Sequence, residues 1–497
     1  MSNYKTPPIF GILRNHRILR ICIILLVVMS LSSFESAFAE DSNDVSEQPA
    51  DGNDVSKQPA DSNDVPEIPP ESTDVSELLE ESKAVAAAAE DSNKVPEAAT
   101  DGNDISEQPA DSNKQADDTL DVSELLEETK KEVPRQWFED EIIMRMLRPY
   151  TDARKYLHDE YRFDVAMEHV LVYQRATGGR RPREQSTYNF TFFGQWHISD
   201  DPNKDQGIMG FSFEERDNVT NHGVADFSRE VGSGFQTHGI RTDERSRTAL
   251  RQLWWRKRFA DDKVTLTLGK LHHSAYYNRN RFAGNARTHF LSYPFSRNIN
   301  RLIPEDGLGA NVNIKVNENF YVSTGFGDAR ANNKTSGFDT IEEGDFFTAV
   351  ELGLTSDIEG AGRGNYRFTV WHTDETDEGA EGYGFALSHD QDLNKKFGFF
   401  TRYGYTEPEV TGIEHFASGG FIVRHPWGIK EDLLGVGISW DKTGDTGEDE
   451  FALEFFYRAQ VTRLLQISPS ILVVFDPVQS DKTEPVAVFG IRARMLF

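Results

Sequence analysis

The chain has 497 residues and a formal net charge of −29 at pH 7, with 27% charged and 37% hydrophobic residues. This acidic balance argues against a nucleic-acid partner, because phosphate binding requires a basic face. Outside the N-terminus no apolar run reaches the roughly 18 residues that a membrane helix needs, so a helical membrane protein is excluded for the mature chain.

The first 39 residues have the features of a secretory signal peptide. Basic residues up to Arg20 precede an apolar stretch at 21–31, and an Ala-x-Ala site ends at Ala39. We therefore expect cleavage before Glu40. The one cysteine, Cys22, would leave with this segment, so the mature protein would have no disulfide and no cysteine-based metal site. A retained membrane anchor is the alternative.

Residues 40–120 form a degenerate acidic array. The decapeptide Asp-Ser-Asn-Asp-Val-Ser-Glu-Gln-Pro-Ala at 41–50 is followed by several variants, and the unit Asp-Val-Ser-Glu-Leu-Leu-Glu-Glu occurs at 74–81 and 121–128. The decapeptides hold too few large apolar residues to offset chain entropy, so we expect a disordered linker. A solvated spacer is the simplest role, and a docking tail for a basic partner or a cation buffer are the alternatives.

The segment 121–160 is prone to form helices. Apolar residues recur at helical spacing after Asp121, and a second apolar stripe is interrupted by Pro149. We expect a helical periplasmic segment. Packing beneath the following domain, or entry into its mouth, stays open.

In residues 161–497 apolar side chains recur at every second position. Phe451 and Phe455 share one parity, whereas Glu454 and Arg458 share the other. Lipid outside and water inside a closed barrel impose this pattern, because closure pairs every backbone group in hydrocarbon. We predict an all-β fold, a transmembrane antiparallel β-barrel of about 16 strands. The candidate strands are 163–173, 187–198, 207–216, 249–259, 263–271, 309–316, 319–326, 346–355, 364–373, 382–389, 397–405, 415–423, 433–441, 450–461, 466–475 and 486–497.

The connections between these strands divide by length. The longest are 217–248, 272–308 and 327–345, and the shortest are 260–262, 317–318 and 462–465. If the first strand rises from the periplasm, all long connections lie outside the cell and all three short ones in the periplasm. The protein is therefore expected in the outer membrane of a Gram-negative bacterium, with the N-terminal linker in the periplasm. Fourteen or eighteen strands, or a soluble β-sandwich or propeller, are the alternatives.

Several segments of this region resemble the OprB family of carbohydrate-selective porins. They are Leu-Arg-Gln-Leu-Trp-Trp-Arg-Lys-Arg-Phe at 250–259, Val-Thr-Leu-Thr-Leu-Gly-Lys at 264–270, Asn-Arg-Phe-Ala-Gly-Asn at 280–285, Glu-Phe-Phe-Tyr-Arg at 454–458 and Phe-Gly-Ile-Arg-Ala-Arg at 489–494. The apolar stretch at 470–474 and the acidic array depart from the family pattern.

The resemblance implies a passive, sugar-favouring pore. Sugars bind planar hydrogen-bonding groups and aromatic faces, and the long connection 272–308 is rich in both. If this loop folds into the lumen, it would form a constriction, and if it caps the barrel outside, it would not. The candidate constriction residues are Arg279, Arg281, Phe282, Arg287, Tyr293, Arg297, Arg301, Glu305 and Asp306, with Glu305 and Asp306 facing the arginines. Candidate residues of the lumen wall are Glu454, Arg458, Arg492 and Arg494, which could equally form a structural charge ladder.

The sequence thus predicts a porin for passive diffusion of small sugars. A general or anion-favouring porin, or a structural or adhesive envelope protein, is the alternative. We expect no catalytic residue, no metal and no cofactor. The expected partners are carbohydrate solutes, the lipid bilayer and the barrel-assembly machinery, whose signal the terminal Phe497 resembles. Homo-oligomerisation stays open.

Overall fold

The computed structural model describes residues 122–131, 141–178, 183–198, 207–240, 247–297, 304–331, 338, 340–375, 379–443, 447–480 and 484–497. The predicted signal peptide with its cleavage site at Ala39 and Glu40, the acidic array and Arg301 lie outside the described residues.

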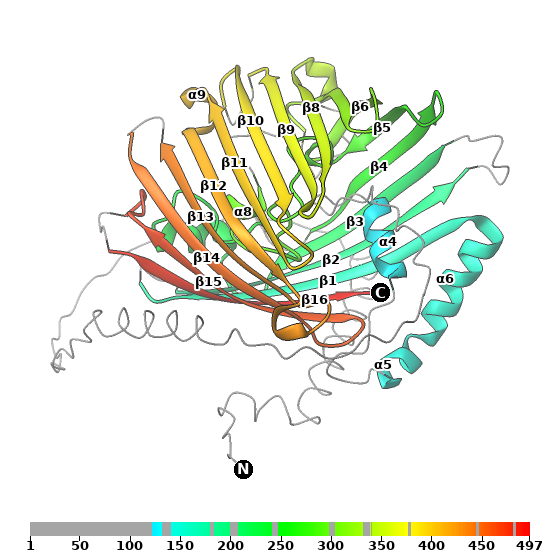
Figure 1. Ribbon diagram of the computed structural model, residues 1–497, viewed down its shortest axis with the longest axis horizontal. Helices are drawn as coiled ribbons and strands as arrows, with labels where there is room; N and C mark the ends of the chain where they lie inside the picture. Colours follow the sequence, from blue (N-terminus) through cyan, green and yellow to red (C-terminus); the bar gives the residue numbers. More distant parts are fainter. Residues whose placement is uncertain are drawn as a thin grey trace, which may run out of the picture. The chain divides into compact units, whose positions relative to one another are not determined.

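Within these ranges, sixteen antiparallel strands form a closed barrel (Figure 1). The strands are β1 (Phe163–Ala176), β2 (Glu184–His197), β3 (Ile208–Asn218), β4 (Arg247–Phe259), β5 (Val264–Leu271), β6 (Gly307–Lys315), β7 (Phe320–Asp328), β8 (Phe346–Ile358), β9 (Gly362–Thr373), β10 (Gly382–Asp392), β11 (Phe397–Thr406), β12 (Ile413–Arg424), β13 (Leu433–Thr443), β14 (Asp449–Gln460), β15 (Leu465–Phe475) and β16 (Val486–Leu496). Each corresponds to one predicted strand, so the predicted barrel is confirmed. The alternatives of a sandwich, a propeller or another strand number are wrong.

The two faces of the barrel wall have opposite polarity. On β14 the side chains of Phe451, Leu453 and Phe455 point outward and are 38%, 38% and 42% exposed, whereas the inward Glu454 is 1% exposed. An apolar outer face and a polar inner face suit a strand between lipid and an aqueous interior. Among the described helices, none has the length and apolar character to cross a bilayer.

The two ends of the barrel differ in their connections. One, which we call the short-turn end, has the connections 260–263, 316–319, 393–396 and 461–464. The other, the long-loop end, has the long connections 219–246 and 272–306, which we call L2 and L3. β4 ends at the short-turn end, and the strands alternate in direction around the barrel, so β16 also ends there and its antiparallel neighbour β1 begins there. The loop lengths therefore divide between the ends as the sequence predicted.

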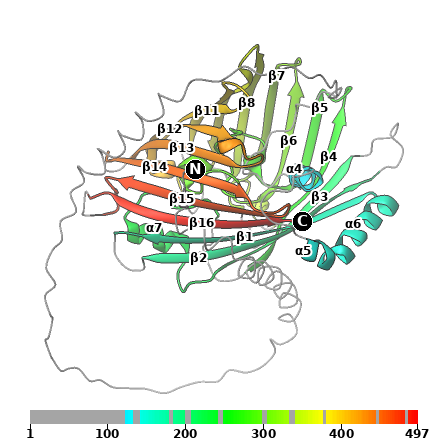
Figure 2. The same ribbon diagram turned by 60° about the horizontal axis from the view of Figure 1, so that its bottom comes forward.

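The helices lie before β1 and in the connections. They are α4 (Val122–Lys130), α5 (Glu141–Met146), α6 (Arg148–Tyr161), α7 (Val224–Val231), α8 (Tyr293–Ser296) and α9 (Pro408–Thr411), with 3-10 turns η2 (His273–Ala275), η3 (Ile341–Glu343) and η4 (Pro426–Gly428). Pro149 stands in the first turn of α6, where its missing N–H leaves no hydrogen bond unmade. The segment predicted as helical and periplasmic is divided, because α4 packs on inward side chains of the barrel while α5 and α6 lie at the short-turn end (Figures 1 and 2).

The last residue, Phe497, is covered by these helices. Its side chain is 7% exposed and packs with Ile143 and Leu147. The Tyr150 ring meets it edge-on, with 6.0 Å between the ring centroids. Its backbone N–H donates to the carbonyl of Met167 on β1 at 2.9 Å. Phe497 thus joins the barrel seam to α5 and α6.

Replacing Phe497 with alanine is expected to destabilise the barrel by about 3–5 kcal/mol, because a buried aromatic ring is removed from a packed cluster. The first measurement is the urea concentration at the midpoint of unfolding. The second is the fraction of protein that migrates as a folded barrel on a gel and shifts to the unfolded position when the sample is heated. Phe489→Ala is the matched control, since Phe489 lies on β16, which Phe497 directly follows, faces outward and is 49% exposed. Equal losses in the two variants would contradict this role.

Candidate pore constriction

Loop L3 runs through the lumen. The Asn278 N–H donates to the carboxylate of Glu351 on β8. Arg492 on β16 donates to the carbonyl of His289 at 3.0 Å. β8 and β16 are half the ring of sixteen strands apart, so L3 contacts opposite sides of the wall. A loop with this path narrows the passage through a barrel.

Phenylalanine side chains anchor L3 to one side of the wall. Phe282, Phe290 and Phe295 are buried against the inner faces of β11 to β14. Glycines there make room for the rings. A Cβ added at Gly398 would lie 2.6 Å from the Phe282 ring, and one at Gly437 would lie 2.8 Å from the Phe295 ring. The wall is therefore shaped to accept the loop.

Arg287 anchors the loop to the other side. Its side chain is buried and forms ion pairs with Glu168 on β1 and with Glu214 on β3, the latter at 2.7 Å. It also donates to Asn189 Oδ1 on β2 at 2.7 Å. A guanidinium shared by three strands holds L3 in position. The predicted constriction residue Arg287 therefore lies within a buried ion-pair network.

Arg281 lies at the edge of the open lumen. Its guanidinium forms ion pairs with Asp390 and Asp392, the latter at 2.9 Å, and donates to the Arg363 carbonyl at 2.8 Å. It also lies 4.8 Å from the centroid of the Phe282 ring. Arg424 on β12 reaches the same ring, at 5.1 Å, and pairs with Asp392. Two guanidinium groups and two carboxylates therefore surround one aromatic ring.

The other predicted constriction residues lie in different surroundings. Arg279 pairs with Glu124 of α4 at 2.7 Å. Arg297 lies 5.7 Å from the centroid of the Tyr293 ring, and Glu305 is partly exposed. Asp306 is buried and pairs with Arg251 on β4 and with His272. Burial raises the pKa of Asp306, but the charges of Arg251 and His272 lower it by a larger amount. The pKa of this carboxyl therefore lies below its usual value.

The four predicted wall residues lie on the inner face of the barrel; they are Glu454, Arg458, Arg492 and Arg494. Glu454 accepts hydrogen bonds from two backbone N–H groups of L3, at 2.6 and 3.0 Å. Arg458 donates to an L3 carbonyl at 3.2 Å, as Arg492 does at 3.0 Å. Arg494 pairs with Glu168 and with Glu128 of α4. These charges thus contact L3 and α4.

L2 also contributes to the interior, which the sequence did not predict. Phe227 and Val231 of α7 and Phe235 pack against inward residues of β14, β15 and β16. The Gly239 N–H donates to the Leu291 carbonyl of L3 at 2.7 Å. The apolar face of α7 was a signal for this contact, but it does not identify which surface the helix covers.

A chamber of about 770 Å³ remains at the short-turn end. Its lining includes Arg281, Phe282 and His289 of L3, together with Arg424, Arg458 and Arg494 of the wall. Helix α4 contributes Glu124 and Glu128, and α6 contributes Arg154. The volume lies within the range of about 300–1,000 Å³ that small-molecule sites occupy. Arg424, Arg154 and the two glutamates were absent from the predicted site. The alternation of apolar and polar residues shows which face a strand residue occupies, but not which distant elements meet there.

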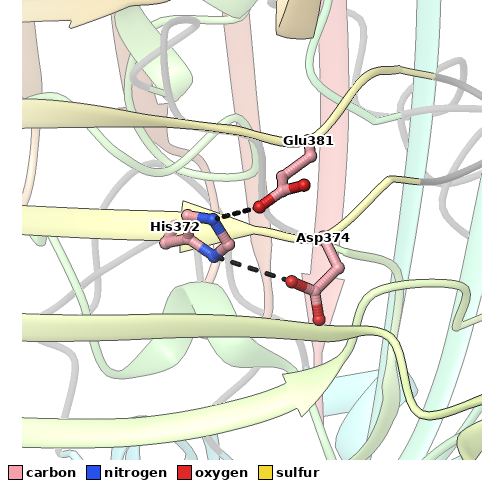
Figure 3. A group of neighbouring side chains, drawn as sticks. All are labelled: His372, Asp374 and Glu381. Carbon is pink, nitrogen blue, oxygen red and sulfur yellow. Dashed lines mark ion pairs between the residues drawn. The ribbon is translucent and has the colours of Figure 1, made fainter.

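One group of His, Asp and Glu side chains lies at the long-loop end (Figure 3). His372 ends 3.8 Å from Asp374 and 3.4 Å from Glu381, measured between nitrogen and carboxylate oxygen. The Glu381 side chain is 69% exposed. Pairs this accessible to water contribute about 0–1 kcal/mol. The group shares no residue with the lining of the chamber.

Comparison with protein families identifies the barrel. The family model described as carbohydrate-selective porin, OprB family, matches residues 205–380 and 375–497, which is more than half of the chain. The chain belongs to the OprB family. The resemblance seen in the sequence is thereby confirmed, and OprB membership makes this barrel an outer-membrane porin that passes small solutes. Family and fold indicate a channel and not an enzyme.

One solved structure shares the fold of this OprB-family chain, and two others align with lower scores. The high-pH structure of Pseudomonas putida OprB aligns with a TM-score of 0.61 at 14% identity, over 70% of this chain and 97% of that one. Its low-pH structure gives 0.48 at 13% identity, over 73% and 100%. A triple mutant of Rhodopseudomonas blastica porin gives 0.40 at 10% identity, over 67% and 100%. No curated protein sequence matches the chain.

Proposed function

We propose that this porin conducts small neutral or weakly acidic carbohydrates passively. The observation that carries the proposal is the grouping of Arg281 and Arg424 about the Phe282 ring, at 4.8 and 5.1 Å from its centroid. Guanidinium and carboxylate groups supply the planar donors and acceptors that sugar hydroxyls require. The buried Phe282 ring contacts both guanidinium groups and holds them beside the chamber. The chamber beside them has room for such a solute.

A general or anion-favouring porin is the second candidate. Among the described residues, six arginines and one lysine line the chamber, against five Asp and Glu side chains and the C-terminal carboxylate. A positive lumen raises the local concentration of anions.

We further propose that the short-turn end faces the periplasm. The first strand begins and the last strand ends there, as insertion of a secreted chain from the periplasm requires. The N-terminal linker would then lie in the periplasm, and Phe497 would be recognised by the assembly machinery.

The test is conductance across a planar bilayer containing the purified full chain. Ion current that falls when glucose or a disaccharide is added, with saturation, is the expected result. Current that follows anion size and ignores sugars would replace the carbohydrate proposal with the second candidate. A folded barrel that carries no current would overturn both and favour a structural or adhesive role.

A further inference from the structure

Helix α4 lies inside the lumen at the short-turn end (Figure 2). Its apolar residues Val122, Leu125 and Leu126 are 0%, 7% and 0% exposed. They pack against inward side chains of the wall, which include Ala166, Phe193, Trp254 and Leu271. Helices shorter than about 12–15 residues are marginal alone in water. This nine-residue helix therefore depends on the wall for its helical form.

Two glutamates on α4 hold lumen arginines. Glu124 pairs with Arg279 of L3 at 2.7 Å. Glu128 accepts two parallel hydrogen bonds from Arg494 on β16, at 2.7 and 2.8 Å. The four-residue spacing places both carboxylates on one helix face. A fork of two bonds fixes orientation as well as position. The helix thus bridges L3 and the strand that closes the barrel.

Both ends of α4 have further contacts. Near its start, the Ser123 hydroxyl donates to Gln195 Oε1 on β2 at 2.9 Å. Near its end, Arg154 of α6 donates to the Thr129 hydroxyl at 2.8 Å. These contacts come from a different strand and from a helix outside the lumen. Together with the apolar face and the two ion pairs, they define a binding site for this one segment.

We propose that α4 is an intrachain plug, an acidic amphipathic helix that occupies the short-turn end of the lumen and narrows the passage. The proposal rests on the proposed pore function for its effect, but not for the position of the helix. The segment that occupies the lumen is residues 122–130 of this chain. Because α4 covers Arg279 and Arg494, its release widens the lumen and returns two positive charges to the conducting path.

Single-channel conductance tests the plug. Deleting residues 122–130 is expected to raise conductance by roughly twofold or more, because current scales with the open cross-section. The double substitution Glu124→Gln and Glu128→Gln should give frequent transitions to the same higher level. Asp152→Asn with Asp159→Asn is the matched control, which removes two carboxylates from the exposed face of α6 and should change neither level. A folded deletion variant with wild-type conductance would overturn the plug.

A second measurement follows the helix without relying on current. On a Cys22→Ser background, Leu126→Cys should react slowly with a bulky maleimide, and the two glutamine substitutions should speed the reaction by at least about tenfold. Tyr156→Cys, at a 57% exposed position, gives the rate of an accessible thiol. Equal rates at the two positions would overturn the proposal. A protected Leu126→Cys in a barrel that never conducts would instead refute the proposed pore function and leave the position of α4 supported.

Acid is expected to release the α4 plug only below about pH 4.5. Burial raises the pKa of Glu128, but Arg494 beside it, with Arg458 and Lys131, lowers the pKa from 4.5 to about 2. His289 of L3 also faces this carboxylate. A lowered pKa stabilises the seated helix above about pH 4.5, and this stabilisation is lost as the pH falls to about 2. Conductance should therefore be constant from pH 7 to 4.5 and rise below it. A rise centred near pH 6 would contradict the assignment to Glu128.

Discussion

Replacing Arg287 with alanine is expected to destabilise the barrel by about 3–5 kcal/mol, because it removes one partner from a buried ion-pair network. Glu168 and Glu214 are 0% and 2% exposed, so each carboxylate would lose a charged partner in a place that water does not reach. Asn189 would lose a hydrogen bond as well. The urea midpoint should fall, and conductance should become larger and noisier, since L3 loses the polar contacts that Arg287 makes with β1, β2 and β3.

Two variants give this prediction its controls. Arg287→Lys keeps the charge, but one ammonium group cannot reproduce the planar fork, so an intermediate loss is expected. Arg297→Ala removes a partly exposed arginine from the same loop and should change the midpoint by less than about 0.5 kcal/mol. An Arg287→Ala protein with the wild-type midpoint and a quiet, wild-type current would show that L3 does not depend on this network.

The barrel could be predicted from sequence because two solvents act on one strand. Successive side chains of β14 face lipid and the lumen in turn. An apolar Phe451 and a charged Glu454 therefore show which face each occupies, even when the neighbouring strands are unknown. The same rule placed Arg492 and Arg494 on the inner face. Loop lengths added the second constraint, since short and long connections separate at the two ends of a barrel.

The constriction could not be predicted to the same degree. Parity shows that Glu168 and Asp390 point inward, but not that the first meets Arg287 and the second Arg281. Those contacts depend on the path of L3, which is set by tertiary packing. No repeating pattern of apolar and polar residues in the sequence encodes this path. Arginines in a long loop, together with inward carboxylates on distant strands, were the available signal. That signal favours a loop inside the lumen, but it does not separate a buried pair from a charge that faces the solute.

The position of α4 shows the same limit. Its octapeptide occurs twice in the sequence, at 74–81 and at 121–128, in a strongly acidic context that favours a solvated segment. The apolar face of Val122, Leu125 and Leu126 predicted a helix with some partner. The partner is the inner wall of a barrel whose strands lie up to 374 residues away, with Leu496 in the same cluster as Val122.

Replacing Arg281 with alanine is expected to shift the ion selectivity of the pore toward cations. Arg281 lines the chamber and neutralises Asp390 and Asp392. Without it, Asp392 keeps Arg424 and Asp390 keeps Arg367, so the local charge falls by one positive unit. The permeability ratio of potassium to chloride should rise by roughly twofold, because charges at a constriction set ion selectivity.

The measurement is the reversal potential across a bilayer in a salt gradient, and its sign distinguishes the possible outcomes. Asp392→Asn removes a negative charge from the same group and should shift the potential in the opposite direction. Arg281→Lys keeps the charge and should leave the potential near the wild-type value while weakening sugar block, since an ammonium group lacks the planar fork. If Arg281→Ala and the wild type share one reversal potential, Arg281 lies outside the conducting path. The proposed sugar contact at Arg281 and Arg424 would then lose its main support, because the Arg281 guanidinium carries both predictions.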